Sequence, residues 1–230
     1  KNQNLDTGES YYEKTFDDKY DKEKKDLAKS ADKYADLIFS TPVDNMSYIK
    51  SKQYLWKLIT DKGCFYKKEK KQSNSKIKIL HAPTNMIFKG TPLVRAAIKK
   101  LQMENYVFDY VELHNVKNKI VLEHLKTADI VLNQFYSFIP ALFGIEAMAS
   151  NCAVLTSADP SIDSDITENS ENAWLITRYW EIYDNLKYLL DNPDKIKFYA
   201  DNGYEYAKKY HTSEAMDKYL NNILKENSII

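Results

Sequence analysis

The chain has 230 residues, of which 43% are hydrophobic and 29% charged, enough for one large domain or two small ones. Its 33 basic and 33 acidic residues balance to a formal charge of zero, which argues against a general nucleic-acid-binding surface. Two cysteines do not suggest a disulfide framework, and no apolar run reaches the roughly 18 residues of a membrane-spanning helix. We therefore expect a cytoplasmic protein. Because the chain begins at Lys1 rather than Met, we also expect a fragment of a longer protein.

The first 66 residues predict a small α/β unit. A charged helix is expected over about 16–34, followed by an apolar strand over 35–40. Asp44 or Asn45 then caps a helix that runs to Ile59, and 64–66 forms one more strand. These elements are too few to close a sheet comfortably, so we interpret residues 1–66 as the remnant of another α/β domain.

Residues 67–76 are polar and contain no apolar side chain, which is typical of a linker between two units. The alternative is a basic patch for membrane lipid or nucleic acid. A run this short that includes an acid, Glu69, is more often a solvated loop, so we favour the linker.

From residue 77 onward, apolar strands alternate regularly with helices. Strands are expected over 77–81, 106–113, 129–132, 152–155 and 173–176. Helices are expected over 92–101, 118–127, 142–150, 179–191, 194–209 and 212–226. Strands that alternate with helices predict βαβ crossovers, and fully apolar strands predict burial on both faces. We therefore expect residues 77–230 to form a Rossmann-like parallel sheet with helices on both faces.

The connection from the first of these strands to its helix contains Lys89 and Gly90 directly before the helix start. A cation beside a helix N-terminus favours an anion, and glycine permits close approach of a ligand to the backbone. This pattern predicts a phosphate site, although a Lys-Gly pair in an ordinary surface connection remains the simpler alternative. The loop does not have the Walker A pattern.

A second connection leads from the strand at 129–132 to a helix that carries Gly144 and Glu146. We expect Glu146 in the first turn of that helix, where it would complement the helix dipole or bind sugar or ribose hydroxyls. His81 and His114 each end a predicted strand on the ligand side of the sheet. The four histidines show no metal-ligand pattern, and five glycines are few for a dinucleotide site.

Taken together, these segments resemble a family. Residues 77–91 resemble the first strand and phosphate loop of the C-terminal domain of GT-B retaining glycosyltransferases, the group 1 or family 4-like class. Ala128-Asp129-Ile130 is similar to the helix–strand junction of that class. Residues 143–155, FGIEAMASNCAVL, resemble its signature G-x-x-E-A-M-A-x-G-x-P-V. The closing helices are similar as well, at 189–193 and 210–212, so the resemblance spans about 77–226.

The resemblance implies an enzyme of bacterial-type polysaccharide biosynthesis. Such an enzyme moves a sugar from a UDP- or GDP-sugar to a glycan or lipid-linked acceptor, with retention and without a metal or other cofactor. Lys89 would bind the diphosphate and Glu146 the ribose hydroxyls, and both would be catalytic. The other donor-binding residues implied are Asn85, Gly90, His114, Phe143 and Gly144. Residues 1–66 would be the end of the N-terminal, acceptor-side domain, and the rest of that domain would be a partner. Peripheral association with the inner face of a membrane is an open alternative.

Several positions depart from the pattern of the class. Its first acid is replaced by Phe138, and the arginine before the lysine by Thr84 or Met86. Ala141 and Asn151 stand where the class commonly has glycine, and Ala153 stands where it has proline. Phe138, Thr84 and Met86 motivate a second hypothesis, a degenerate and non-catalytic binding module. A third hypothesis, a sugar-nucleotide epimerase, rests on the same fold-level pattern.

Overall fold

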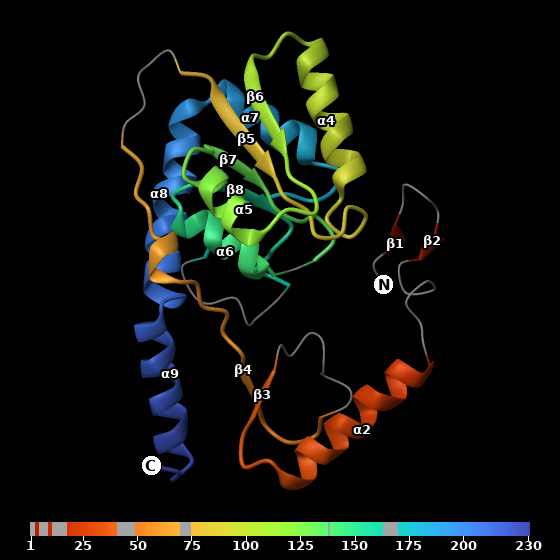
Figure 1. The fold of residues 1–230 in the computed structure, drawn as a ribbon, viewed down its shortest axis with the longest axis vertical. Helices are drawn as coiled ribbons and strands as arrows, with labels where there is room; N and C mark the ends of the chain where they lie inside the picture. The colour runs from red at the N-terminus through yellow and green to blue at the C-terminus, as the bar shows by residue number, and fades with distance from the viewer. Residues whose placement is uncertain are drawn as a thin grey trace. The chain divides into compact units, whose positions relative to one another are not determined.

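The computed structural model describes residues 3–4, 9–10, 18–40, 49–69, 75–137, 139–162 and 170–230. The chain divides into two compact units, Lys1–Lys57 and Leu58–Ile230 (Figure 1). Phe138, the start of the helix expected at 44–59 and the centre of the expected linker lie outside the described residues.

The first unit contains a predicted helix and a parallel pair of strands, of which one was predicted. Short strands β1 (Gln3–Asn4) and β2 (Glu9–Ser10) pair antiparallel, and α2 (Asp18–Tyr34) is the expected charged helix. Strand β3 (Ile38–Ser40) lies within the strand expected at 35–40.

The helix expected to run to Ile59 is wrong over Gln53–Leu55, which form strand β4 parallel to β3. Tyr54 is buried, and its ring centroid lies 5.7 Å from that of Phe39. The backbone N–H of Trp56 donates to the Ser40 carbonyl at 2.8 Å, which extends the pairing by one residue. Pairing with β3 therefore overrides the helical spacing of this short apolar run.

The second unit is built on a parallel sheet. In the described part of the chain, this sheet has five strands in the order β6-β5-β7-β8-β9. Their bounds are β5 (Ile77–His81), β6 (Phe108–Glu112), β7 (Ile130–Leu132), β8 (Ala153–Thr156) and β9 (Leu175–Ile176). Leu80 of β5 lies opposite Val111 on one side and Val131 on the other, and Val131 lies opposite Val154. The predicted Rossmann-like sheet is confirmed.

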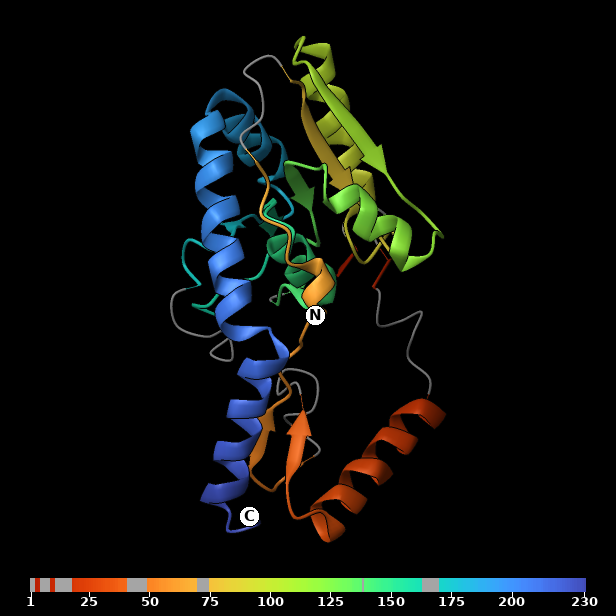
Figure 2. The same ribbon diagram turned by 60° about the vertical axis from the view of Figure 1, so that its left-hand side comes forward.

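Helices cover both faces of this sheet. Their bounds are α4 (Thr91–Met103), α5 (Asn118–Leu125), α6 (Ala141–Ala149), α7 (Ile182–Asp191), α8 (Pro193–Tyr210) and α9 (Ser213–Glu226). Side chains of a strand alternate between faces. Ile79 and Leu132 therefore pack with α4 and α7, whereas Leu80 and Val131 pack with α5, α6 and α8. Figure 2 shows the same layers from another side. None of the described helices is both long and apolar enough to cross a membrane.

Residues 58–69 pack against the second unit, so that unit begins ahead of the expected linker. The strand expected at 64–66 is wrong, because Lys62–Cys64 form a 3-10 turn, η1, capped by Asp61. Cys64 is buried in the core with α6, and the Tyr66 N–H donates to the Ala149 carbonyl at 3.0 Å. Whether residues 1–66 come from an acceptor-side domain stays a prediction.

Candidate functional site

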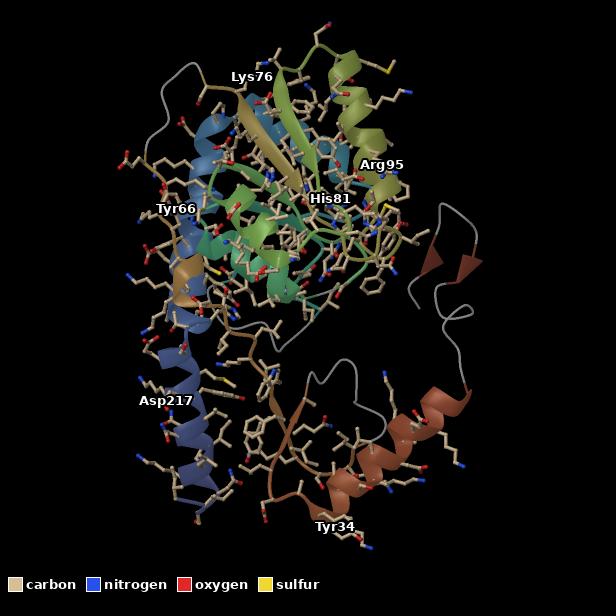
Figure 3. The ribbon with its side chains drawn as sticks, viewed as in Figure 1. Tyr34, Tyr66, Lys76, His81, Arg95 and Asp217 are labelled. Atoms are coloured by element: carbon tan, nitrogen blue, oxygen red, sulfur yellow. The ribbon has the colours of Figure 1, made fainter. Side chains whose placement is uncertain are left out.

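The topology of the sheet positions the candidate site. The chain leaves β5 for β6 on one side and returns to β7 on the other, so the connections after β5 and β7 diverge. In parallel α/β sheets, ligands bind at this divergence, outside the carboxyl ends of the strands. His81 at the end of β5 and Arg95 on α4 are labelled near this edge in Figure 3. The relevant connections are residues 82–90 and 133–140.

His81 joins the ends of β5 and β7 to the start of α4. Its Nδ1 lies 2.7 Å from the Leu132 carbonyl oxygen and its Nε2 2.9 Å from Thr91 Oγ1. A carbonyl only accepts, so Nδ1 carries the proton and Nε2 accepts from the threonine hydroxyl. Burial lowers the pKa of His81 to about 4. His81 is therefore a neutral clamp between the two connections.

The connection after β5 is a tight loop with internal hydrogen bonds. Asn85 Oδ1 accepts from the Phe88 N–H at 2.9 Å, and the Asn85 carbonyl accepts from the Lys89 N–H at 3.0 Å. Gly90 has a φ of +77° and caps α4. A Cβ on Gly90 would lie 3.3 Å from Phe135 Cδ2, so both conformation and space favour glycine. The Gly90 N–H already donates to the Ile87 carbonyl. Asn85 and Gly90 therefore have structural roles in shaping the loop.

Lys89 points from this loop toward the connection after β7. Its side chain is half-buried, and its ammonium group donates to Gln134 Oε1. Burial lowers the pKa of Lys89 to about 8. Among the residues that the structure describes, no carboxylate forms an ion pair with Lys89. The carboxyl edge of the sheet thus holds a cation whose partner is a neutral amide.

Glu146 lies on α6, on the side of α5. The expectation of a first-turn acid is wrong, because α6 begins at Ala141 and its first turn contains no acid. Glu146 is 7% exposed, and its Oε1 accepts one hydrogen bond, from Asn118 Nδ2 at 3.3 Å. Burial raises the pKa of Glu146, and the bond from Asn118 opposes that rise. Dipole compensation therefore does not explain this acid, and its carboxylate retains capacity for hydroxyl donors.

The remaining predicted residues are spread over the same region. A Cβ on Gly144 would lie 2.6 Å from Asn133 Nδ2, which gives this glycine a packing role. Phe143 is half-buried against the core, and His114 is exposed beyond the end of β6. Lys89 and Gly90 contact the connection after β7, whereas Glu146 contacts α5. In the described part of the chain, no hydrogen bond joins Lys89 to Glu146.

Sequence reasoning missed Gln134, Asn118 and two arginine networks. Arg95 holds Glu112 through two hydrogen bonds, Nη2 to Oε1 at 2.6 Å and Nε to Oε2 at 3.2 Å, and contacts Met86 Sδ at 3.7 Å. The bonds from Arg95 hold the pKa of Glu112 below its usual range. The pair of polar residues after a buried strand, Asn133 and Gln134, was the available signal. The partner of Gln134 in another loop was not readable from sequence.

The second arginine network follows β8 and β9. Arg178 forms an ion pair with Asp159, whose other oxygen accepts from the Ser161 N–H at 2.8 Å and hydroxyl at 2.6 Å. Arg178 Nη1 also donates to the Ser157 carbonyl at 3.3 Å. The side chains of Arg178 and Asp159 are 23% and 8% exposed, so this charge pair is largely buried.

Two positions that depart from the resembled pattern adopt the left-handed conformation that glycine favours. Ala141 has a φ of +53° and Asn151 a φ of +55°. Asn151 follows the end of α6, where its N–H donates to the Met148 carbonyl and the Cys152 N–H to the Ala147 carbonyl. These two bonds form a Schellman motif. Asparagine tolerates this conformation, whereas alanine is strained in it.

In the ranges that the structure describes, no group of three or more His, Cys, Asp or Glu is arranged to hold a metal ion.

Comparison with known proteins bears on the fold. No family model matches the chain, and no curated protein matches its sequence. Among solved structures, sucrose-phosphate synthase from Thermosynechococcus elongatus covers 83% of this chain at 15% identity, with a TM-score of 0.59. Anabaena HepE in complex with UDP-glucose covers 89% at 11% identity, with a TM-score of 0.61. TarM covers 90% at 18% identity, with a TM-score of 0.56.

This chain spans 57% of the synthase, 68% of HepE and 47% of TarM. At these identities the likeness shows a common fold. The predicted fold, the Rossmann-like domain of GT-B glycosyltransferases, is confirmed.

Proposed function

We propose that this chain supplies the nucleotide-sugar-binding half of a glycosyltransferase, with a nucleoside diphosphate sugar as donor. The observation that carries the proposal is Lys89, a half-buried cation without a carboxylate partner in the described structure, at the divergence of β5 and β7. HepE, which shares the fold, has been solved with UDP-glucose and with UDP. A diphosphate is the anion that such a site would take in this fold.

The proposed chemistry follows from charge and position. Sugar transfer leaves negative charge on the departing diphosphate, and a positioned cation stabilises that charge. Lys89 would supply it. The first amides of α6 would add donors, because the first four N–H groups of a helix lack intrahelical partners. Glu146 would accept hydrogen bonds from ribose hydroxyls, because its carboxylate has acceptor capacity beyond the bond from Asn118. His114, Phe143 and Gly144 would line the donor site.

Calorimetry with UDP, GDP and ADP on the intact protein tests donor binding. Wild type is expected to bind at least one of them, and Lys89→Ala to weaken that binding at least tenfold, the loss of one charge-assisted contact. Lys99→Ala is the matched control, because Lys99 is exposed on α4. Binding of none of the three nucleotides would sink the proposal.

The proposal extends to the complete reaction. It includes a glycan or lipid-linked acceptor, retention of anomeric configuration, catalysis without a bound metal, and a cytoplasmic site of action. The acceptor site would come from an N-terminal domain of the same protein. Product analysis by NMR on the full-length protein, with and without EDTA, tests stereochemistry and metal independence. An inverted product, or loss of turnover with EDTA, would overturn the corresponding part.

One observation favours a second function, a non-catalytic module that binds a nucleotide sugar or glycan. Arg95, the other cation near the loop, is neutralised by Glu112, and the loop itself carries Met86. A single cation gives less stabilisation of a leaving diphosphate than two. Donor hydrolysis or sugar transfer by the full-length protein, abolished by Glu146→Gln, would reject this alternative.

A further inference from the structure

Gln134 lies just after β7, separated from its last residue by Asn133, and hydrogen bonds hold its backbone. The residue is 2% exposed. Its carbonyl accepts from the Ser157 N–H at 3.0 Å and from Thr156 Oγ1 at 3.1 Å. Both donors belong to the end of β8, so the neighbouring strand fixes the main chain of Gln134. The main-chain atoms from which the Gln134 side chain extends are therefore held in place.

That side chain joins two loops. Oε1 accepts from Lys89 in the connection after β5, and Nε2 donates to the Ile139 carbonyl in the connection before α6. An ammonium group only donates and a peptide carbonyl only accepts, so the partners fix the orientation of the amide. Glutamine satisfies both. Glutamate or leucine of similar size would leave at least one of them without its hydrogen bond.

The amide also preserves the charge of Lys89. A neutral acceptor holds an ammonium group without cancelling it, whereas a carboxylate at the same place would form an ion pair. The titratable and charged side chains that interact with His81 in this region are Lys89, Arg95 and Glu112. His81 is neutral, and Arg95 and Glu112 neutralise each other. Lys89 therefore supplies the net positive charge of this group of side chains.

We propose that Gln134 is a positioning residue for donor binding, which aims the Lys89 ammonium at the carboxyl edge of the sheet and ties it to the loop that leads into α6. Gln134 acts through Lys89 and does not itself contact the donor. The inference rests on the function proposed above, because that function assigns a diphosphate to Lys89. It follows that Lys89 and the start of α6, the helix that carries Glu146, move together.

The experiment uses Gln134→Glu and Gln134→Leu, with Gln102→Glu and Gln102→Leu as controls on the exposed surface of α4. Calorimetry measures the affinity for UDP and for inorganic pyrophosphate. NMR on protein with ¹³C-labelled lysines follows the titration of Lys89, assigned by its loss in Lys89→Arg. Both Gln134 variants are expected to bind each ligand at least tenfold more weakly, and both Gln102 variants within twofold of wild type. The Lys89 titration midpoint is expected to rise in Gln134→Glu and to fall in Gln134→Leu.

A purely structural role for Gln134 would lower thermal stability and leave the Lys89 midpoint unchanged, which overturns the proposal. If Gln134→Leu does not fold, Gln134→Glu decides, because it keeps the size and polarity of the side chain, removes the N–H donor to Ile139 and places a negative charge beside Lys89. Wild-type binding of UDP with unaltered affinity in the Gln134 variants rejects the positioning role and leaves the proposed function standing. Failure of wild type to bind any nucleotide rejects the proposed function. Pyrophosphate affinity and the Lys89 midpoint then decide the role of Gln134.

Discussion

Two connections at the carboxyl edge of the same sheet each hold a cation, and they hold it differently. After β5, Lys89 is held by the neutral amide of Gln134. After β9, Arg178 is held by the carboxylate of Asp159, with the serine at 161 completing the network. A charge paired with an opposite charge fastens two loops, whereas a charge held by a dipole stays available to a ligand. The comparison separates a structural cation from one that could bind a donor.

The largest expected effect is the loss of stability when the structural cation, Arg178, is removed. Arg178→Leu should lower the free energy of unfolding by about 3 kcal/mol, because it leaves the carboxylate of Asp159 buried without its partner. Urea denaturation measures this. The double variant Arg178→Leu/Asp159→Leu should recover part of the loss. UDP affinity of the folded Arg178→Leu protein should stay within twofold of wild type, and a tenfold loss would contradict the division between the two cations.

The next effect concerns Lys89, the cation that stays available to a ligand, and it depends on pH. The folded-state pKa of Lys89 is lowered from 10.5 to about 8, so the unfolded chain binds more protons between these values. The free energy of unfolding of wild type should therefore rise, relative to Lys89→Met, as the pH increases from 8 to 10.5, by about 1 kcal/mol or more. Urea denaturation of both proteins at pH 7 and pH 10 measures the change. A difference that is constant with pH would show that Lys89 is not desolvated.

A smaller effect is expected at the start of α6, on the ligand side. Ala141→Gly should raise the free energy of unfolding by about 1 kcal/mol, because glycine removes the strain of a φ of +53°. Ala149→Gly, at the other end of the same helix, is the control and should destabilise by about 1 kcal/mol. Thermal and urea unfolding compare the two. Destabilisation by both substitutions would place Ala141 in ordinary helical conformation.

The smallest effect is expected for a third cation, Arg95, whose side chain is 57% exposed. Arg95→Met should leave the free energy of unfolding almost unchanged, because an exposed ion pair contributes little. UDP affinity should change less than twofold, since Glu112 already neutralises this arginine. Calorimetry measures this affinity, and a tenfold loss would show that Arg95 contributes to ligand binding.

Much of the fold could be predicted from the sequence because strong local signals and tertiary packing agree in residues 77–230. Strand β5 was predicted at its observed bounds, and Pro92 and Thr212 mark helix starts that the structure confirms. Strand β4 was not predictable in the same way. It contains three residues, so its identity depends on pairing with β3 and not on a local period.

The site was only partly predictable for a related reason. Lys89 and Glu146 could be singled out from their positions after strands and on a helix, and their roles remain predictions. The contact between Lys89 and Gln134 joins residues from different loops, which no local pattern encodes. The position of Ala141 was a noted departure, but the meaning of that departure required its backbone angle.

Asn151, which stands after α6 where the resembled pattern has glycine, has a consequence for local unfolding. Besides its backbone turn, Asn151 accepts from the Lys68 N–H at 3.3 Å and donates to Asp201 Oδ1 at 3.2 Å. One amide thus fastens the segment before β5 and the middle of α8 to the end of α6. Glycine would make the same turn without either attachment. Segments joined in this way should open together, so hydrogen exchange at the Lys68 amide should report on the opening of α6 and α8.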